Sequence, residues 1–284
     1  MIESLETYQN ADGGWPYRPG GSSWTEPTVY ALLAGYATGD STGRVRAFEW
    51  LRQLQRGDGA WAPKGGVEQS TWVTSLVALL PPQDIGEAAH RGAIRWLLGQ
   101  TPANATYLYR LKSWMNGNPF AEPHAGFSWV KDTAGWSTPT ALGILALVKE
   151  NRRHPDSALK DRIANARAFL LDHRCADGGW NHGSMRALGV DTLSYPETTG
   201  TALLALAGGH SGADATLAAS IVRAEAWWKD CPSCEAANWL MLGLRAAGRA
   251  KAGPPASLKS RTIPDAALRK IAAAGDRGTE IFLA

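Results

Sequence analysis

Glutamate recurs at or just before the start of apolar segments, beside an aromatic residue. Carboxyl groups can donate protons and aromatic faces stabilise positive charge, so this pairing suits acid catalysis at a cavity. If the apolar segments are helices that converge, we expect the pairs to lie around one mouth of that cavity. The predicted cavity-lining or ligand-binding residues are Glu26, Glu68, Glu235, Trp24, Trp72, Trp136, Tyr195 and Trp239.

The same positions also have a purely structural interpretation. Thr and Ser cap helix starts, Pro suits the first turn, and Glu there interacts favourably with the helix dipole. A residue that recurs in every repeat commonly has a repeat-wide role. Asp191 is a further carboxylate upstream of one apolar segment, and we keep it as a catalytic candidate.

Three cysteines offer a different chemistry. Cys231-x-x-Cys234 has the spacing of half a zinc site, and Cys175 lies in the equivalent loop of the adjacent repeat. Zinc held by Cys231, Cys234 and Cys175, with His173 or His182 as the fourth ligand, is one interpretation. A redox dithiol and an ordinary turn are the others, and the odd number of cysteines argues against a disulfide framework.

Composition excludes several classes of protein. The chain has 284 residues, 44% of them apolar, and its net charge of +3 is spread along the sequence without a basic block. We therefore expect no nucleic-acid binding. The N-terminus lacks signal-peptide features, and no segment has the roughly 20 apolar residues of a membrane span. We expect a cytoplasmic protein, for which peripheral membrane contact stays open. The 13 Trp and 31 Gly require a structural cause.

That cause is an internal repeat, whose clearest copy is Arg46-Ala47-x-x-Trp50-Leu51-x-x-x-Gln55-x-x-x-Gly59-x-Trp61. It predicts a helix that ends near Gln55, a tight turn that uses the positive φ of Gly59, and then a tryptophan. Related copies end at Trp15, Trp129 and Trp180. Trp15 and Trp61 are 46 residues apart, and Trp129 and Trp180 are 51 apart. This period fits two helices and two loops.

Each turn precedes a second helix that is apolar on nearly all sides, which indicates burial on all sides. The helices before the turns carry a charged stripe and are expected to face solvent. This alternation predicts an all-α fold, an α/α toroid of about five repeats whose full closure is left open. The expected inner helices are Thr28–Ala37, Thr71–Leu80, Thr140–Lys149, Thr198–Ala207 and Ala236–Ala247.

We divide the chain into a toroid domain at 1–252 and a C-terminal tail at 253–284. Residues 101–125 form an insertion that carries several aromatic residues, and we expect it to border the cavity mouth. The tail has one expected helix near Asp265–Ala274. It either packs where a sixth hairpin would close the ring or serves as an interaction segment.

The Arg46–Trp61 segment resembles the QW motif of squalene and oxidosqualene cyclases, and the resemblance covers roughly residues 2–247. The chain is thus similar to the superfamily of α/α toroids that contains terpenoid cyclases and protein prenyltransferases. The resemblance implies an isoprenoid or other apolar ligand in a central cavity. It also implies a structural role, tying outer-helix ends to their neighbours, for Gln9, Gln55, Trp15, Trp61 and Trp180.

The resemblance points to one catalytic candidate. When Thr199-Gly200 is set against the T-A that follows the D-x-D-D motif of class II cyclases, Glu197 falls on the central, proton-donating Asp. Tyr195 and Thr198 stand where the flanking Asp residues would be, so the motif is incomplete. The chain contains neither D-x-D-D nor D-D-x-x-D, and the zinc-ligand segments of protein prenyltransferases are not recognisable.

Three functions follow from these observations. The first is an isoprenoid-handling enzyme, a cyclase, isomerase or transferase, with an apolar ligand in the ring. The second is a non-catalytic toroid that binds a ligand or a protein, which the missing acid motif favours. The third is a carbohydrate-active enzyme, since Trp platforms and carboxylate pairs also serve sugars. The sequence favours it least, because the repeat turns already account for most of the Trp residues. An apolar cavity would indicate the first, a plugged ring centre the second, and a polar groove with two opposed carboxylates the third.

Overall fold

The computed structural model describes all of the chain except residues 1, 3, 116–123, 184, 188–189, 209–214, 232 and 250–256. Helices dominate the described residues, and each strand in them is only two residues long. No helix in these described ranges is long and apolar enough to cross a membrane.

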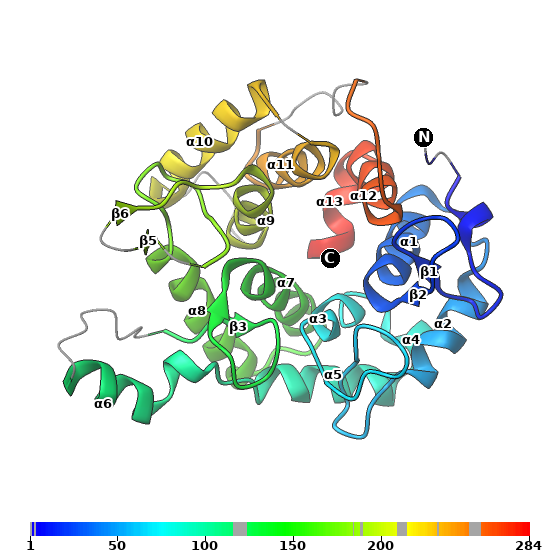
Figure 1. Cartoon of the computed structure of the whole chain (residues 1–284), viewed down its shortest axis with the longest axis horizontal. Helices are drawn as coiled ribbons and strands as arrows, with labels where there is room; N and C mark the ends of the chain where they lie inside the picture. The colour runs from blue at the N-terminus through cyan, green and yellow to red at the C-terminus, as the bar shows by residue number, and fades with distance from the viewer. Residues whose placement is uncertain are drawn as a thin grey trace.

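The helices form a ring of two layers, which confirms the predicted all-α toroid (Figure 1). The inner helices are apolar on nearly all sides and are buried around the ring centre. They are α1 (Thr25–Thr38), α3 (Val73–Val77), α7 (Ser137–Arg153), α9 (Pro196–Ala207) and α11 (Cys234–Ala246). The outer helices are α2 (Arg44–Gln53), α5 (Glu87–Leu98), α8 (Ser157–Asp172) and α10 (Ala218–Lys229). The predicted insertion contains α6 (Tyr107–Met115).

Inner helix α3 is much shorter than the helix predicted over Thr71–Leu80. The backbone N–H groups of Leu79 and Leu80 bond to carbonyls three residues back, which tightens the last turn. Pro81 then lacks an N–H group and disfavours helical conformation in the residue before it. The chain restarts as the short helix α4 (Pro82–Ile85).

Tryptophan holds each Gly-x-Trp turn with two hydrogen bonds. The indole Nε1 of Trp61 donates to the Leu51 carbonyl at 2.7 Å, and its backbone N–H donates to Thr74 Oγ1 at 3.0 Å. The first bond fixes the end of an outer helix, and the second fixes the start of an inner helix. The same pair of bonds joins Trp15 to Leu5 and Thr28, and Trp180 to Leu170 and Thr199.

Glutamine at the end of an outer helix joins one repeat to the next. Gln55 Nε2 donates to the Gly59 carbonyl at 3.0 Å and to the Ala89 carbonyl of α5 at 2.9 Å. Gly59 has a φ of +88°, and a Cβ there would lie 2.9 Å from the backbone of Gly92, so the turn rests directly on α5. The equivalent bonds join Gln9 to Gly13 and Gly43.

Short antiparallel hairpins precede three of the inner helices. They pair β1 (Trp15–Pro16) with β2 (Ser23–Trp24), β3 (Phe127–Ser128) with β4 (Gly135–Trp136), and β5 (Arg186–Ala187) with β6 (Val190–Asp191). Strands β2 and β4 run directly into α1 and α7. These hairpins therefore lie at the end of the ring where the inner helices begin.

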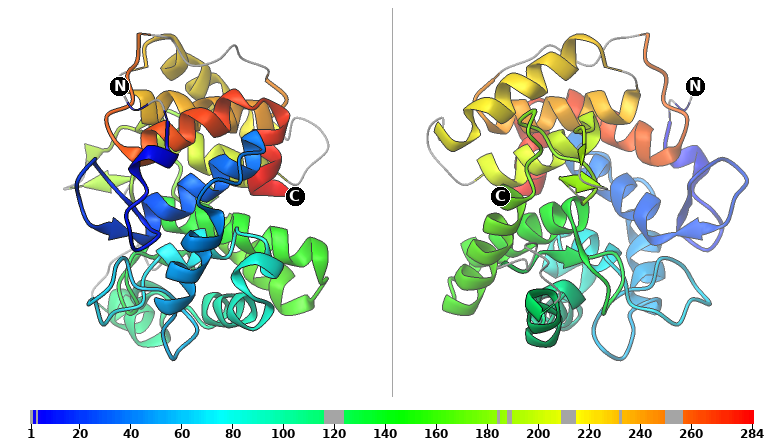
Figure 2. Two further views of the ribbon diagram at one scale, coloured as in Figure 1. Left: turned by 90° about the vertical axis from the view of Figure 1, so that its right-hand side faces the viewer. Right: turned by 60° about the vertical axis from the view of Figure 1, so that its left-hand side comes forward.

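The C-terminal segment closes the ring. Helix α12 (Ile263–Ala273) packs against both α11 and α1 and fills the space between them (Figure 1 and Figure 2). Helix α13 (Asp276–Leu283), which the sequence pattern does not predict, contacts α1, α7, α11 and α12. Lys149 Nζ donates to the Ile281 carbonyl at 3.0 Å, and the Arg277 guanidinium donates to the Tyr36 carbonyl at 3.0 Å. Polar contacts with two inner helices thus hold α13 in place.

Aromatic side chains fill the ring centre beside α13. The Trp239 ring lies 6.2 Å from that of Tyr30 and 5.6 Å from that of Phe282, measured between centroids. All three side chains are buried and belong to one continuous apolar cluster that includes residues of every inner helix. At this level the ring is a packed core.

Gln55→Ala removes the amide that joins two repeats. We expect the free energy of unfolding, measured by urea denaturation, to fall by about 1–2 kcal/mol because two carbonyls lose their donor. Gln53→Ala changes an exposed glutamine of the same helix and should cost less than about 0.5 kcal/mol. Equal effects of the two substitutions would contradict the role of Gln55.

Phe282→Ala empties the space that this ring occupies against Trp239. We expect the free energy of unfolding to fall by about 3–5 kcal/mol, the usual cost of such a cavity. Glu280→Ala, on the exposed side of α13, should change it by no more than about 0.5 kcal/mol. If Phe282→Ala cost as little as its control, α13 would not be docked in the ring in solution.

Candidate functional site

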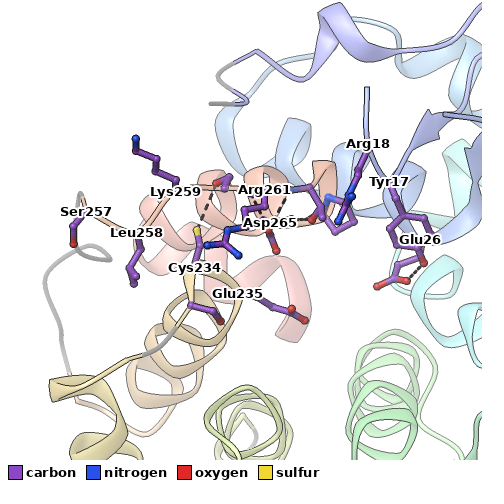
Figure 3. A pocket seen from close by; sticks show the side chains of 14 residues that line it. Tyr17, Arg18, Glu26, Cys234, Glu235, Ser257, Leu258, Lys259, Arg261 and Asp265 are labelled. Carbon is purple, nitrogen blue, oxygen red and sulfur yellow. Dashed lines mark hydrogen bonds between the residues drawn. The ribbon is translucent and has the colours of Figure 1, made fainter. Parts of the chain in front are cut away.

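A pocket of about 740 Å³ opens at the end of the ring where α1 and α11 begin (Figure 3). Its walls come from three segments that are distant in the sequence: the β1–β2 loop with the first turn of α1, the first turn of α11, and the segment that leads into α12. The lining residues are Tyr17, Arg18, Glu26, Ser233, Cys234, Glu235, residues 257–262, Pro264 and Asp265.

Glu26 lies in the first turn of α1 and is partly buried. Burial raises the pKa of its carboxyl, and a hydrogen bond that Tyr17 Oη donates to Glu26 Oε2 opposes the shift. Burial and the neighbouring Glu26 also raise the pKa of Tyr17, so the phenol keeps its proton and remains the donor. Trp24 packs edge-on against Tyr17, with 5.5 Å between ring centroids. The position of the Glu26 carboxyl is therefore well defined.

Glu235 approaches the pocket from the first turn of α11. Ser233 caps this helix by accepting a hydrogen bond from the Ala236 N–H group at 3.1 Å, which places Glu235 at the pocket wall. Water reaches the Glu235 side chain through the pocket, but the surrounding protein still limits its solvation. This desolvation, together with the charges of Asp265, Glu197 and Glu26, raises the pKa of Glu235 to about 7. The carboxyl therefore keeps a proton at pH values where an ordinary glutamate has lost it.

Asp265 belongs to the wall that the C-terminal segment supplies. Thr262 and Asp265 form a capping box at the start of α12, because each side chain accepts a hydrogen bond from the other residue's backbone N–H. The Asp265 Oδ2 atom accepts from the N–H groups of Arg261 at 3.0 Å and Thr262 at 3.1 Å. The same carboxylate thus caps the start of α12 and adds negative charge beside Glu235.

The structure brings some of the predicted carboxylates together and separates others. Glu26 and Glu235 share the pocket, and Glu197, in the first turn of α9, is close enough to influence the pKa of Glu235. Asp191 is exposed on strand β6, opposite Arg186. Glu68 is exposed in the loop before α3. Neither of these last two lines the pocket.

The predicted aromatic residues are spread over the same end of the ring and its core. Trp24 contacts the pocket residue Tyr17. Trp72 packs against Trp129 with 4.9 Å between ring centroids, whereas Trp136 and Tyr195 are 37% and 47% exposed. Trp239 is only 4% exposed and lies in the core beside Tyr30 and Phe282 rather than on a cavity wall.

The three cysteines do not converge. Within the described part of the chain, no three His, Cys, Asp or Glu side chains are grouped so that they could hold a metal ion, and the zinc site considered for Cys231, Cys234 and Cys175 is therefore not assembled. Cys175 is buried in the turn before Trp180. Cys234 lies in the pocket wall, with its Sγ 3.5 Å from Ser260 Oγ. All three thiols are free.

Sequence reasoning missed the residues that complete the pocket: Tyr17, Arg18 and residues 257–265. One signal was present, since Thr262-x-x-Asp265 with a proline between them is a typical helix start. It predicts the beginning of α12, but not the place where α12 docks.

Comparison with known proteins establishes the fold and leaves the activity open. No protein-family model and no curated protein matches the chain. Among solved structures, it is similar to the endo-β-1,4-glucanase CMCax from Acetobacter xylinum, with 11% identity, a TM-score of 0.61, and coverage of 97% of this chain and 96% of the glucanase. It is also similar to a GH76 α-mannanase from Bacteroides thetaiotaomicron, with 12% identity, a TM-score of 0.59, and coverage of 89% and 85% respectively.

The type II terpene cyclase MstE from Scytonema is similar as well, with 15% identity, a TM-score of 0.54, and coverage of 96% of this chain and 78% of the cyclase. At such identities the likeness shows a shared α/α-toroid fold. The resemblance to squalene cyclases and to their superfamily stays a prediction.

The raised pKa of Glu235 makes stability depend on pH. Between about pH 4.5 and about pH 7 the folded state holds a proton that the unfolded state has released, so stability falls as the pH rises through this window. We expect Glu235→Gln to gain stability relative to the wild type across the same window and to keep a constant advantage above it. Urea denaturation at several pH values measures the difference.

Glu68→Gln, at an exposed loop carboxyl outside the pocket, is the matched control for this titration. A difference between Glu235→Gln and the wild type that stays flat with pH would show that Glu235 titrates like an ordinary glutamate.

Proposed function

We propose that this chain is a carbohydrate-active enzyme that cleaves a glycosidic bond in the pocket. The observation that carries the proposal is that Glu26 and Glu235 enter one polar pocket from two different inner helices. Glycoside hydrolysis uses a carboxyl that holds its proton near neutral pH together with a second carboxylate. The similarity in fold to a glucanase and a mannanase supports the same substrate class.

Glu235 acts as the general acid in this proposal. Its proton passes to the leaving-group oxygen as the bond between that oxygen and the anomeric carbon breaks. Glu26 accepts a proton from the water that attacks the anomeric carbon. Burial raises the pKa of Glu26, which makes its carboxylate a stronger base, and the hydrogen bond from Tyr17 partly opposes this effect.

Several hydrogen-bonding residues of the pocket favour a saccharide over an apolar ligand. Side chains of Arg18, Ser233, Ser260 and Thr262 line it, and such donors and acceptors suit sugar hydroxyl groups. The ring centre, where an apolar chain would be expected, is occupied by Tyr30, Trp239 and Phe282. We therefore place the proposed cleavage reaction at the mouth of the ring.

A second candidate is acid-initiated chemistry on an isoprenoid. One observation favours it: Glu26, with its raised pKa, lies near the aromatic rings of Tyr17 and Trp24, which would stabilise a carbocation. The terpene cyclase MstE, to which this chain is similar in fold, has been solved with geranylgeranyl dihydroxybenzoate. The charged and hydroxyl-bearing residues that line the pocket argue for the saccharide instead. The filled ring centre argues against an apolar ligand there and also fits a non-catalytic toroid.

The test compares the two substrate classes on the same protein. The purified chain is incubated with a panel of neutral and charged polysaccharides, and new reducing ends are quantified. Farnesyl diphosphate, geranylgeranyl diphosphate and squalene are tested in separate reactions, which are analysed by mass spectrometry. We expect reducing ends to appear, and Glu235→Gln to lower kcat/KM by about 10²–10⁴-fold because the proton donor is lost.

Glu68→Gln is the matched control and should retain the wild-type rate. A prenyl product that disappears in Glu26→Gln would replace the saccharide proposal with the isoprenoid one. No product in either arm would favour a non-catalytic toroid.

A further inference from the structure

The pocket that holds the two glutamates also carries a cluster of cationic side chains. Arg18, Lys259 and Arg261 all line it, and all three are exposed to solvent. In the view of Figure 3, Arg18 lies beside Tyr17, above Glu26, and Arg261 lies beside Asp265, above Glu235. A ligand that reaches both glutamates therefore also passes the two arginines.

One backbone contact brings the two arginines into the same wall. The Ile263 N–H group donates to the Tyr17 carbonyl at 2.9 Å, which ties the β1–β2 loop to the start of α12. Arg18 directly follows Tyr17, and Arg261 precedes Ile263 by two residues. The backbones that carry Arg18 and Arg261 are thus neighbours because of a contact between segments that are far apart in the sequence.

The cations are not neutralised by the protein. Among the described residues, no carboxylate forms an ion pair with Arg18, Lys259 or Arg261. The nearest acidic residue in sequence, Asp265, directs its Oδ2 atom to backbone N–H groups of its own helix start. The guanidinium groups are therefore free to bind an anion from solution.

Guanidinium groups bind carboxylate, sulfate and phosphate oxygens through paired hydrogen bonds, and a neutral glycan offers no such partner. We propose that the substrate of this pocket is an acidic saccharide, whose anionic group is held by Arg18 and Arg261 while Glu26 and Glu235 flank the bond to be cleaved. This inference rests on the proposed function, since it names the substrate class of the same site. Lys259 adds long-range attraction for the same charge.

The test measures binding to the full chain carrying Glu235→Gln, which cannot turn the ligand over. Calorimetry compares three probes: a galacturonate oligomer, a chondroitin sulfate oligomer and cellohexaose. We expect an acidic oligomer to bind at least tenfold more tightly than cellohexaose, with an affinity that falls as NaCl is added. The two acidic probes distinguish a carboxylate from a sulfate as the recognised group.

The decisive comparison adds Arg18→Gln and Arg261→Gln to this protein. We expect a loss of about 10²-fold in affinity for the acidic oligomer, since each charge-assisted contact is worth about tenfold or more. The matched control adds Arg95→Gln and Arg249→Gln, which remove the same charge from exposed arginines outside the pocket. The control should change the affinity by less than about twofold.

Each outcome decides between the two proposals. Equal binding of acidic and neutral oligomers, unaffected by the two arginine substitutions, would overturn the acidic-substrate inference and leave the saccharide function standing. A loss of affinity in both arginine pairs alike would show only a general effect of net charge and would also overturn it. Failure of every saccharide to bind would remove the proposed function itself.

Discussion

Two hydrogen bonds from a single tryptophan set the geometry of three of the repeats. The Trp15 indole fixes where the preceding segment ends, and its backbone N–H fixes Thr28 within the first turn of α1. Because Glu26 lies two residues before Thr28, this bond also sets where the Glu26 carboxyl reaches the ring mouth. A buried N–H or carbonyl without a partner destabilises the folded state, so loss of either bond would lower the free energy of unfolding. The turn thereby links packing in the core to the position of Glu26 in the pocket.

The filled ring centre limits where a ligand can bind in this chain. Toroids of this kind include glucanases, a mannanase and a terpene cyclase, so the fold permits both polar and apolar substrates. In this chain Phe282 and Trp239 occupy the centre, and the open volume lies at the end where the inner helices begin. Helix N-termini there carry positive partial charge, which favours acidic groups at the rim.

Local patterns predicted much of the fold and half of the site. Helix α1 and the turn at Trp61 follow from apolar composition and from the Gly-x-Trp spacing, both of which act within a few residues. The recurrence of Glu at helix starts also identified Glu26 and Glu235. The opposite wall depends on where α12 docks, and no local pattern encodes that contact. Helix α13 was not predicted because Gly275 is typical of the end of a helix, and the amphipathic stretch after it is too short to indicate another helix.

Closure by α12 has a consequence for how the protein folds. The partner that covers one side of α1 comes after all five inner helices in the sequence. Until α12 docks, that side of α1 presents an apolar edge to solvent or to chaperones, and the ring folds through contacts of very large sequence separation, which form slowly. The pocket needs both parts of the chain, because residues from 17–26 and from 257–265 line it. A chain without residues 257–265 would carry both glutamates but not the complete pocket.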